Sequence, residues 1–295
     1  MNQPSSHRFD GSKKFVQAEN SPEPKDKMKS KEADVIIAEN AKWLDGYQER
    51  LFASGERSVL IVLQAMDAAG KDGTLRRLLT GVNPQGIVVT SFKRPTPEEV
   101  NHDFLWRVQK ALPQKGYIGV FNRSHYEEVL VTRVHPEFIL AQHNPGVSSK
   151  DGKITLPKDF WKNRFAAIRA FEKHLTESGT IIIKFFLNVS KDEQKKRLVD
   201  RMTTPEKNWK FNITDIKERQ HWKEYMSAYE EMINETACEH APWYVIPADD
   251  KDNMRALVST AVRDVLSKYP VDYPDAVATI EQELKEAEVL LKMED

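Results

Sequence analysis

The sequence predicts an α/β fold, a three-layer sandwich in which helices cover both faces of a central parallel sheet. Five short runs rich in β-branched and aromatic residues suit strands that are buried on both faces. These runs are 58–64, 86–92, 116–122, 180–187 and 242–248. Helical patterns fall between them, and this alternation favours right-handed crossovers within one sheet. A glycine-containing segment joins the first run to a helix, which is the third observation.

Composition limits the classes of protein that the chain can belong to. It has 295 residues, of which 40% are hydrophobic and 30% charged, with a formal net charge of −1. This length can bury one sizeable core or two small ones, and affinity for a polyanion has to come from a local basic patch. A single cysteine fits a reducing compartment. Because no signal peptide or membrane-spanning run is evident, we expect a cytoplasmic protein with neither a membrane nor a nucleic-acid partner.

The elements divide the chain into an arm, one domain and a tail. Residues 1–32 are polar and contain prolines, so we expect an arm that lies outside the core. Apolar side chains at three- and four-residue spacing predict the first helix over 33–52. No linker interrupts 33–270, which we expect to form a single domain, and the stretch 142–159 indicates a surface excursion. Residues 271–295 predict a C-terminal helix or tail.

Two helices carry sequence signatures of their first turns. In the run TPEEVNHDFLWRVQKAL, Thr96 is an N-cap, Pro97 occupies the first helical position and Glu99 stands three residues after the cap. We therefore expect one helix along this run. The run SKDEQKKRLVDRM repeats the device with Ser190 and Glu193.

The segment LQAMDAAGKDGT follows the first strand and leads into a helix. In this arrangement, backbone amides and the positive end of the helix dipole favour a phosphate group at one spot. The usual pattern G-x-x-x-x-G-K-[ST] is met at Gly70 and Lys71, but Ala65 replaces the first glycine and Asp72 replaces the hydroxyl residue. The alternative is a glycine turn whose lysine is only solvated.

Loss of the hydroxyl residue removes the usual protein ligand of magnesium, and Asp67 inside the loop is the natural replacement. An acid in a phosphate cradle would repel its ligand unless a cation lay between them. We therefore predict that Asp67 binds a divalent metal. The residues predicted to contact phosphate are Ala68, Ala69, Gly70, Lys71, Asp72, Gly73 and Thr74.

The end of the third strand carries a second group of polar residues. Asn122 and Arg123 end this strand, and Glu127 and Arg133 follow on the next helix. We expect the arginines to aim planar, bidentate donors at the strand ends, where the glycine loop also opens. His125 is a weaker candidate for a base, because a single histidine beside an aromatic residue is more often structural.

Further cations are predicted at the same edge and in a lid. Lys93 and Arg94 follow the second strand, and ligands bind at the carboxyl edge of such sheets. Arg197 and Arg201 are four residues apart, so they share a helix face. The segment 197–215 is predicted to form a lid that closes over phosphates. The alternative is a solvated helix-turn-helix.

The strings MDAAGKDG, FNRSHYE, RVHPE and KNWKF, in this order, resemble the polyphosphate kinase 2 family of polyphosphate:nucleotide phosphotransferases. The resemblance runs from about Ala33 to Tyr269. It implies a thymidylate-kinase-like P-loop core with a helical lid, a homodimer or homotetramer, and Mg²⁺ as cofactor with Mn²⁺ as a substitute. It also implies reversible phosphoryl transfer between inorganic polyphosphate and nucleotides, from AMP and ADP to ADP and ATP, with GMP and GDP as further acceptors.

The same resemblance assigns residues to roles. It places the metal-binding acid at Asp67, the P-loop lysine at Lys71, and lid arginines at Arg197 and Arg201. The pair Asn122–Arg123 stands where diphosphate-specific members commonly have Asp-Arg. The asparagine form resembles the class III branch, whose members phosphorylate both nucleoside monophosphates and diphosphates.

The residues themselves suggest a mechanism of charge cancellation and alignment. Both substrates are anions whose reacting ends must come within about 3 to 3.5 Å of each other. We predict that Lys71 and the loop amides grip the phosphate, and that Lys93, Arg94 and Arg76–Arg77 supply a basic track for polyphosphate. Two alternatives stay open. One is an ATP-dependent nucleoside monophosphate kinase, which predicts a hydroxyl where Asp72 stands, and the other is a nucleotide- or polyphosphate-binding regulator without catalysis.

Overall fold

A computed structural model describes residues 4–275 and 278–293 of the chain. Its main sheet has strands in the order β1-β8-β7-β2-β4-β3. All neighbouring strands in this sheet are parallel, as predicted, except that β1 runs antiparallel to β8. The strands are β1 (Arg8–Phe9), β2 (Ser58–Gln64), β3 (Ile87–Ser91), β4 (Ile118–Asn122), β7 (Thr180–Asn188) and β8 (Trp243–Pro247).

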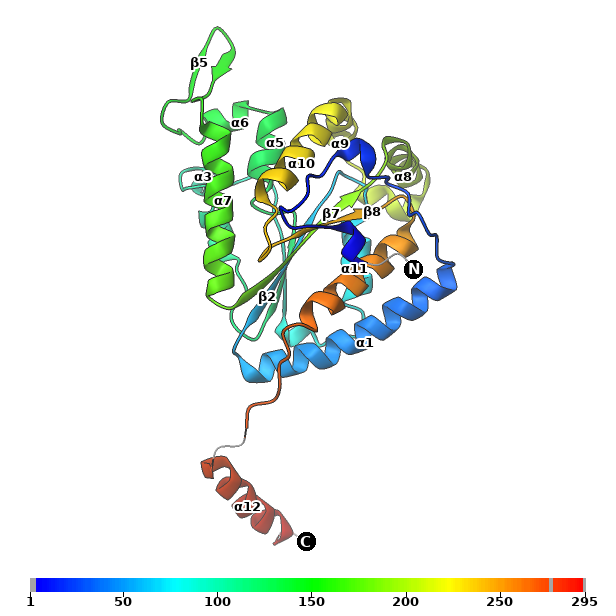
Figure 1. Cartoon of the computed structure of the whole chain (residues 1–295), viewed down its shortest axis with the longest axis vertical. Coiled ribbons are helices and arrows are strands. Elements are labelled where there is room, and N and C mark those ends of the chain that lie inside the picture. Colours follow the sequence, from blue (N-terminus) through cyan, green and yellow to red (C-terminus); the bar gives the residue numbers. More distant parts are fainter. Residues whose placement is uncertain (1–3, 276–277, 294–295) are drawn as a thin grey trace.

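Helices cover both faces of the sheet, which confirms the predicted three layers (Figure 1). Helices α1, α2 and α11 contact one another on one side, and α5, α7 and α10 do so on the other. The helices are α1 (Ser30–Ser54), α2 (Lys71–Leu78), α3 (Pro97–Val100), α4 (Trp106–Lys110), α5 (Glu127–Val134), α6 (Glu137–Leu140), α7 (Phe160–Glu177), α8 (Lys191–Thr203), α9 (Ile213–Glu218), α10 (Trp222–Thr236), α11 (Lys251–Leu266) and α12 (Ala278–Lys292).

Strand β2 lies at the centre of the core, and every one of its residues is buried. Because helices cover both faces, such a strand is continuously apolar rather than alternating. The register brings the carboxyl ends of neighbouring strands together. Leu63 of β2 pairs with Asn122 of β4, which also pairs with Ser91 of β3. The loops that follow β2, β3 and β4 therefore open at one edge of the sheet.

The N-terminal arm is part of the core, and the prediction that it lies outside was wrong. Residues 8–9 add strand β1 to the edge of the sheet beside β8. Phe9 and Phe15 are buried, and Phe15 stacks edge-on against Phe186 of β7. Two aromatic side chains in a polar segment are too few to produce a periodic pattern, so periodicity could not reveal this contact.

The helix predicted from Thr96 is interrupted. Its first turn forms as expected, because Thr96 Oγ1 accepts from Glu99 N (3.2 Å) and Thr96 N donates to Glu99 Oε2 (2.8 Å). The helix then stops at Val100, and α4 begins at Trp106. Between them, the Asp103 side chain accepts from the amide of Leu105 (2.9 Å), a local bond that competes with helix formation.

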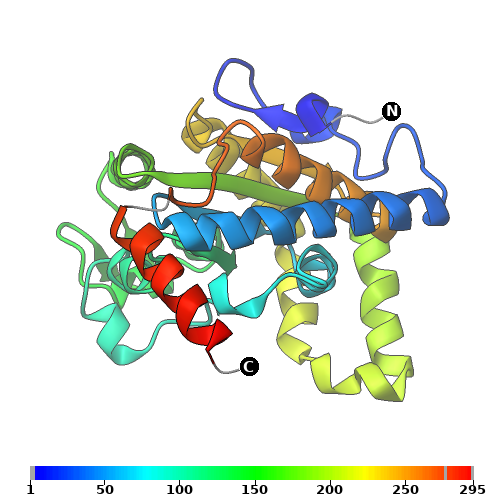
Figure 2. The same cartoon turned by 90° about the horizontal axis from the view of Figure 1, so that it is seen from below.

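Three further segments complete the chain. The predicted surface excursion contains a hairpin of β5 (Ser148–Lys150) and β6 (Lys153–Thr155). Helix α8, the short helix η4 (Pro205–Lys210) and α9 project from the body as a hairpin (Figure 2). Helix α12 stands apart from the body in Figure 1. Among the described residues, no helix has both the length and the apolar character that a membrane span requires.

Candidate active site

The glycine loop between β2 and α2 buries its lysine. Lys71 Nζ donates to two backbone carbonyls of the loop, Ala65 O (2.8 Å) and Met66 O (3.2 Å). Burial, and next the charge of Arg123, lower the pKa of Lys71 to about 8. No ion pair to Lys71 is found within the described part of the chain. Its direct partners are therefore neutral, and the carboxylates that act on its charge without contacting it, first Asp67 and then Glu127 and Asp72, raise its pKa.

Arg123 links the glycine loop to the end of β4. Its guanidinium forms an ion pair with Asp67 and lies 3.5 Å from Glu127 Oε2. Its backbone has φ of +63°, a left-handed conformation that is uncommon outside glycine, and its amide donates to Leu63 O (3.1 Å). The carboxylate of Glu127, followed by that of Asp67, raises the pKa of Arg123 above its ordinary value. The structure thus brings together Asp67, Lys71 and Arg123, as the strand order predicts.

Two further side chains, Asn122 and Gln64, hydrogen-bond to acidic residues of this cluster. Asn122 Nδ2 donates to Asp72 Oδ1 (2.8 Å), so the residue that replaces the P-loop hydroxyl is oriented by the strand end. Gln64, buried at the end of β2, donates to Glu127 Oε1 (2.8 Å) and accepts from Ser124 N (3.0 Å) in the amide orientation that satisfies both ends. The prediction did not include Gln64, although a polar residue that ends an apolar strand was a signal for it.

The remaining residues of the loop differ in their exposure to solvent. Asp72 is exposed in the first turn of α2, whereas Ala69 is fully buried. Thr74 is also buried, and its hydroxyl lies 4.0 Å from Met254 Sδ of α11. The Thr74 hydroxyl is therefore turned to α11, whereas Asp72 is open to solvent.

The two lid arginines have different surroundings. Arg201 forms an ion pair with Asp215 of α9, at 3.1 Å from Oδ2. Burial, and next repulsion by Asp67, raise the pKa of Asp215 to about 6, so the lid hairpin places this acid towards the glycine loop. Arg197 is buried and donates to the backbone of that loop, as described below. Sequence reasoning missed Asp215, because nothing in its neighbours marks it.

Arg133 does not join the cluster, contrary to its predicted orientation. Its guanidinium forms an ion pair with Glu231 of α10 and lies 4.1 Å from the ring centre of Trp161. Lys93 and Arg94 follow β3 as predicted, and both are exposed. The Arg94 guanidinium lies over the ring of Phe138 at 4.9 Å.

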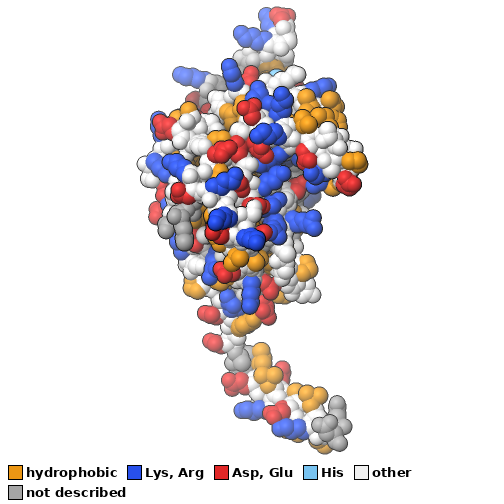
Figure 3. Space-filling view, turned by 90° about the vertical axis from the view of Figure 1, so that its right-hand side faces the viewer, with side chains coloured by type: hydrophobic (Ala, Val, Ile, Leu, Met, Phe, Trp, Pro, Cys, Tyr) orange, Lys and Arg blue, Asp and Glu red, His pale blue; other side chains and the backbone are white. Residues whose placement is uncertain are grey.

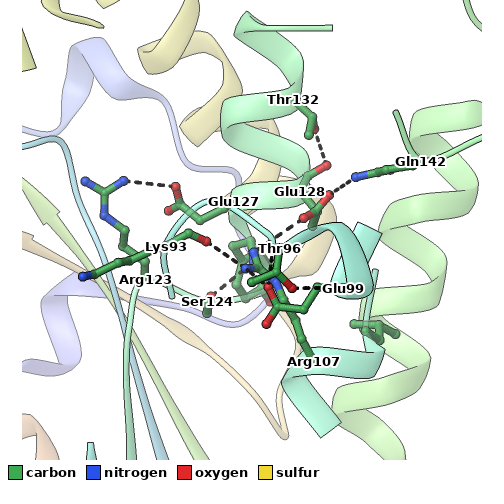
Figure 4. A network of polar contacts seen from close by, with 12 residues as sticks. Lys93, Thr96, Glu99, Arg107, Arg123, Ser124, Glu127, Glu128, Thr132 and Gln142 are labelled. Carbon is green, nitrogen blue, oxygen red and sulfur yellow. Dashed lines mark hydrogen bonds and ion pairs between the residues drawn. The ribbon is translucent and has the colours of Figure 1, made fainter. Parts of the chain in front are cut away.

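A buried ionic network lies beside the cluster, on the other side of the start of α5 (Figure 4). Arg107 is buried and donates to Lys93 O (2.8 Å), and it lies 3.7 Å from Glu128 Oε1. Gln142 Nε2 donates to Glu128 Oε2 (2.6 Å). A cavity of about 270 Å³ is lined by Arg107, Glu128 and Gln142 together with Glu99. The network fixes the segment after β3, and the sequence showed no pattern for it.

His125 has structural contacts, in line with the expectation that a histidine beside an aromatic residue is more often structural than a base. It is 1% exposed, and its Nε2 lies 3.4 Å from Glu172 Oε1 inside the core. Glu172 also forms a buried ion pair with Lys184 of β7 (2.6 Å). His125 therefore contacts the buried pair of Glu172 and Lys184, and among the described residues no side-chain hydrogen bond or ion pair joins it to the strand-end cluster.

The oxygen donors of the cluster fit a magnesium ion that is shared with a substrate. Mg²⁺ is usually held by one or two carboxylates, with substrate phosphates and water completing its shell. Asp67 and Asp72 offer such carboxylates on the loop itself. The charge of Asp67 also contributes to the raised pKa of Asp215 on α9. Within the described residues, no group of three or more histidine, cysteine, aspartate or glutamate side chains could hold a metal ion by itself.

Comparison with known proteins identifies the family. The family model described as "Polyphosphate kinase 2 (PPK2)" matches residues 27–147 and 151–273. The chain belongs to the polyphosphate kinase 2 family. This confirms the resemblance seen in the motifs, and it identifies the protein as a polyphosphate kinase with a P-loop kinase fold.

Relatives in this family align over most of the chain. It is 48% identical over 249 residues to "ADP-polyphosphate phosphotransferase" of Rhodopseudomonas palustris, covering 84% of each chain. It is 46% identical over 231 residues to "AMP/ADP-polyphosphate phosphotransferase" of Meiothermus ruber, covering 78% of this chain and 80% of that one. The crystal structure of polyphosphate kinase 2 from Arthrobacter aurescens TC1 superposes with a TM-score of 0.84 at 38% identity, covering 97% of both chains.

Proposed function

We propose that this polyphosphate kinase catalyses Mg²⁺-dependent, reversible phosphoryl transfer between inorganic polyphosphate and adenine nucleotides, converting AMP to ADP and ADP to ATP. The observation that carries the proposal is the meeting of Asp67, Lys71 and Arg123 where the strands end. The printed names of two relatives, which include ADP and AMP/ADP as substrates, support the choice of acceptors.

The geometry suits a reaction in which positioning and charge cancellation do most of the work. Lys71 and the first turn of α2 would bind the phosphoryl group in transfer, and Arg123 would neutralise its oxygens from the strand end. Mg²⁺, held by Asp67 and the phosphates, would supply further charge neutralisation. Closure of the lid hairpin would bring Arg201 to the phosphates and exclude water.

One assay separates this proposal from its rivals. The protein is incubated with Mg²⁺, polyphosphate and AMP or ADP in the absence of ATP, and the nucleotides are separated by chromatography. We expect ADP and ATP to form, to disappear when the metal is chelated, and to return when Mg²⁺ or Mn²⁺ is added. With AMP as the only nucleotide, an ATP-dependent nucleoside monophosphate kinase or a non-catalytic regulator would form neither product. In the ADP reaction, a control without polyphosphate measures any ATP that forms from two ADP molecules. Parallel reactions with GMP and GDP measure the preference between purines.

The basic surface predicts how polyphosphate binding depends on salt. Lys and Arg side chains gather over the middle of the face that lies on the right of Figure 1, near α8, with acidic side chains among them (Figure 3). A chain that contacts several cations releases several counterions, so its apparent affinity should fall steeply with added salt. The affinity for AMP should fall much less. Equal salt dependence of the two ligands would contradict an extended polyphosphate track.

The choice between acceptors is assigned to Asn122. Its amide donates to Asp72 at 2.8 Å, and Asn122→Asp would place two carboxylates in that contact. We expect the ratio of kcat/KM for AMP and ADP to change in this variant. The matched control is Asn83→Asp, because Asn83 caps the short helix η3 (Pro84–Gly86) and aspartate can make the same cap. A ratio that is unchanged in Asn122→Asp would remove this residue from acceptor choice.

We also infer a cytoplasmic homodimer or homotetramer, on the basis of the family resemblance and the single cysteine. The edge strand β3 exposes Val88 and Val89, which is the kind of surface that contact with another subunit would cover. Light scattering during size-exclusion chromatography measures the assembly state, and a monomer at micromolar concentration would contradict it. Cell fractionation tests the location.

A further inference from the structure

Five successive carbonyl groups of the phosphate-binding loop, 65–69, are all hydrogen-bonded to side chains. Lys71 bonds the first two, at 2.8 and 3.2 Å. Helix α8 bonds the other three from the opposite side. Gln194 Nε2 donates to the third carbonyl (2.9 Å), and Arg197 Nη1 donates to the fourth (3.4 Å) and the fifth (2.6 Å). Helix α8 therefore holds the loop through its backbone in this structure.

All five N–H groups of the Arg197 guanidinium have partners inside the protein. Besides the two loop carbonyls, Nε donates to Glu193 Oε1 (2.8 Å), and Nη2 donates to Ala248 O (2.6 Å) and Asp249 O (3.1 Å). The side chain is buried, with 5% of the residue exposed. Arg197 could reach a phosphate only by breaking several of these bonds. This differs from Arg201, whose partner is the lid acid Asp215.

The contacts of Arg197 act on the direction of the loop amides. In a trans peptide the carbonyl and the next N–H point in opposite directions. Binding the Ala69 carbonyl therefore turns the Gly70 N–H away from α8, towards the side where Lys71 and α2 begin. Ala68 is held at φ of +59°, a left-handed conformation that is unfavourable for alanine because its Cβ approaches the following carbonyl oxygen. Bonds to its carbonyl and to the next one offset this strain.

We propose that Arg197 is a positioning residue that shapes the phosphate-binding loop, and that it does not bind the phosphate in transfer. The proposal rests on the polyphosphate kinase activity of the family. It differs from the role that the motif assigns to this arginine. Its removal should disturb the orientation of loop amides, and so lower kcat more than it raises KM.

A double-mutant cycle with Ala68 tests this role. Arg197→Lys keeps the charge but cannot bond two carbonyls with a planar fork, and we expect kcat to fall by about tenfold or more. Glycine adopts left-handed conformations without strain, so Ala68→Gly should reduce the need for Arg197. We expect the kcat of the double variant to be about fivefold or more above the value obtained by multiplying the effects of the two single substitutions. Purely multiplicative losses would overturn the proposal.

Arg201→Lys in the same cycle is the matched control. It lies four residues along α8 and has no bond to the loop, so Ala68→Gly should not rescue it. The salt dependence of polyphosphate affinity gives a second readout, since removal of a direct phosphate contact reduces its slope by about one. We expect a reduced slope for Arg201→Ala and an unchanged slope for Arg197→Ala. A reduced slope for Arg197→Ala would show direct contact and overturn the proposal.

Thermal unfolding of each variant shows whether it folds. If Arg197→Lys or Arg197→Ala fails to fold, Gln194→Met removes one loop bond with a smaller loss of contacts, and it enters the same cycle with the same expectation. The unmodified protein is assayed alongside with polyphosphate and ADP. If it forms no ATP, the proposed function fails, whereas an active protein with multiplicative losses overturns only the role of Arg197.

Discussion

Lys71 and Lys184 are both buried and both hydrogen-bonded, yet only one of them lies where an anion can bind. Lys184 Nζ contacts Glu172 Oε2 at 2.6 Å, so its charge is cancelled inside the core. Lys71 Nζ donates only to carbonyl oxygens within the described part of the chain, so no carboxylate contacts its charge directly. Burial alone would raise the pKa of Glu172, but Lys184 and His125 hold it below its ordinary value. By contrast, burial and Arg123 lower the pKa of Lys71.

The difference teaches how to distinguish a ligand-binding cation from a structural one. A buried cation with a carboxylate partner stabilises the fold only as half of a pair. A buried cation with neutral partners is held in place by hydrogen bonds, but no carboxylate contacts it. An anion can therefore still pair with it. A phosphate bound there would supply a counter-charge in direct contact with the cation, as we propose for Lys71.

The largest expected effect is on catalysis at the strand-end cluster. Lys71→Met should lower kcat/KM for polyphosphate-dependent ATP formation by about 10³-fold, because the cation nearest the transferred group is lost. The melting temperature should stay close to that of the unmodified protein. Lys173→Met, an exposed lysine on α7, is the matched control. Substantial activity in Lys71→Met would contradict the phosphate role, and Asp67→Ala tests the metal role in the same assay.

The next effect is on stability in the core. Lys184→Met should lower the free energy of unfolding by about 3 to 5 kcal/mol, because Glu172 is left buried without a cation. Denaturant unfolding measures this change. The double variant Lys184→Met with Glu172→Leu should recover most of the loss, because it removes the unpaired charge as well. If the single variant is fully stable but inactive, the two lysines have been assigned the wrong way round.

A smaller effect comes from Asp215 in the lid. Its pKa is raised from 3.8 to about 6 by burial and then by Asp67. The folded protein therefore binds a proton that the unfolded chain releases, so this residue costs stability as the pH rises from about 4 to 6. A shift of one pKa unit corresponds to about 1.4 kcal/mol, and the partial exposure of Asp215 reduces the stability cost calculated from the shift. We expect Asp215→Asn to stabilise the ligand-free protein by about 1 to 2 kcal/mol at pH 7.5 and to have no effect near pH 4.

The control for this prediction lies on the same hairpin. Asp200 is partly exposed, and hydrogen bonds from Lys207 and next Thr204 lower its pKa. Asp200→Asn should therefore give no stabilisation at pH 7.5. Calorimetric melting of both variants between pH 4 and pH 8 makes the comparison. If Asp215→Asn raised the free energy of unfolding by the same amount at every pH, the electrostatic explanation would be contradicted.

Much of this architecture could be predicted from the sequence, because its determinants are local. Five of the six strands of the central sheet form at the β-branched runs, and four of them, β2, β4, β7 and β8, are almost wholly buried, which selects such residues. The motif spacing located Lys71 and Asp67 on one loop. Arg123 followed from the order of strands. These features depend on chain neighbours and on a small set of permitted topologies.

The rest depends on partners that are distant in the chain. Arg133 meets Glu231 and Trp161, and nothing beside it in sequence announces either. Arg197 shares a helix face with Arg201, but its rotamer and burial turn it to the loop backbone. The arm enters the sheet because β8 has a free edge, which is a property of the assembled fold. Side-chain direction and edge pairing are set by tertiary contacts that periodicity does not contain.

The most direct test of the central claim is the titration of Lys71 itself. Nuclear magnetic resonance of isotope-labelled lysine side chains, assigned with Lys71→Arg, reports its pKa with and without tripolyphosphate. We predict a pKa of about 8 in the free protein, against an ordinary 10.5, and a clear rise when tripolyphosphate binds. A pKa that stays near 10.5 in both samples would show that Lys71 is neither buried nor a phosphate ligand, and it would contradict this account.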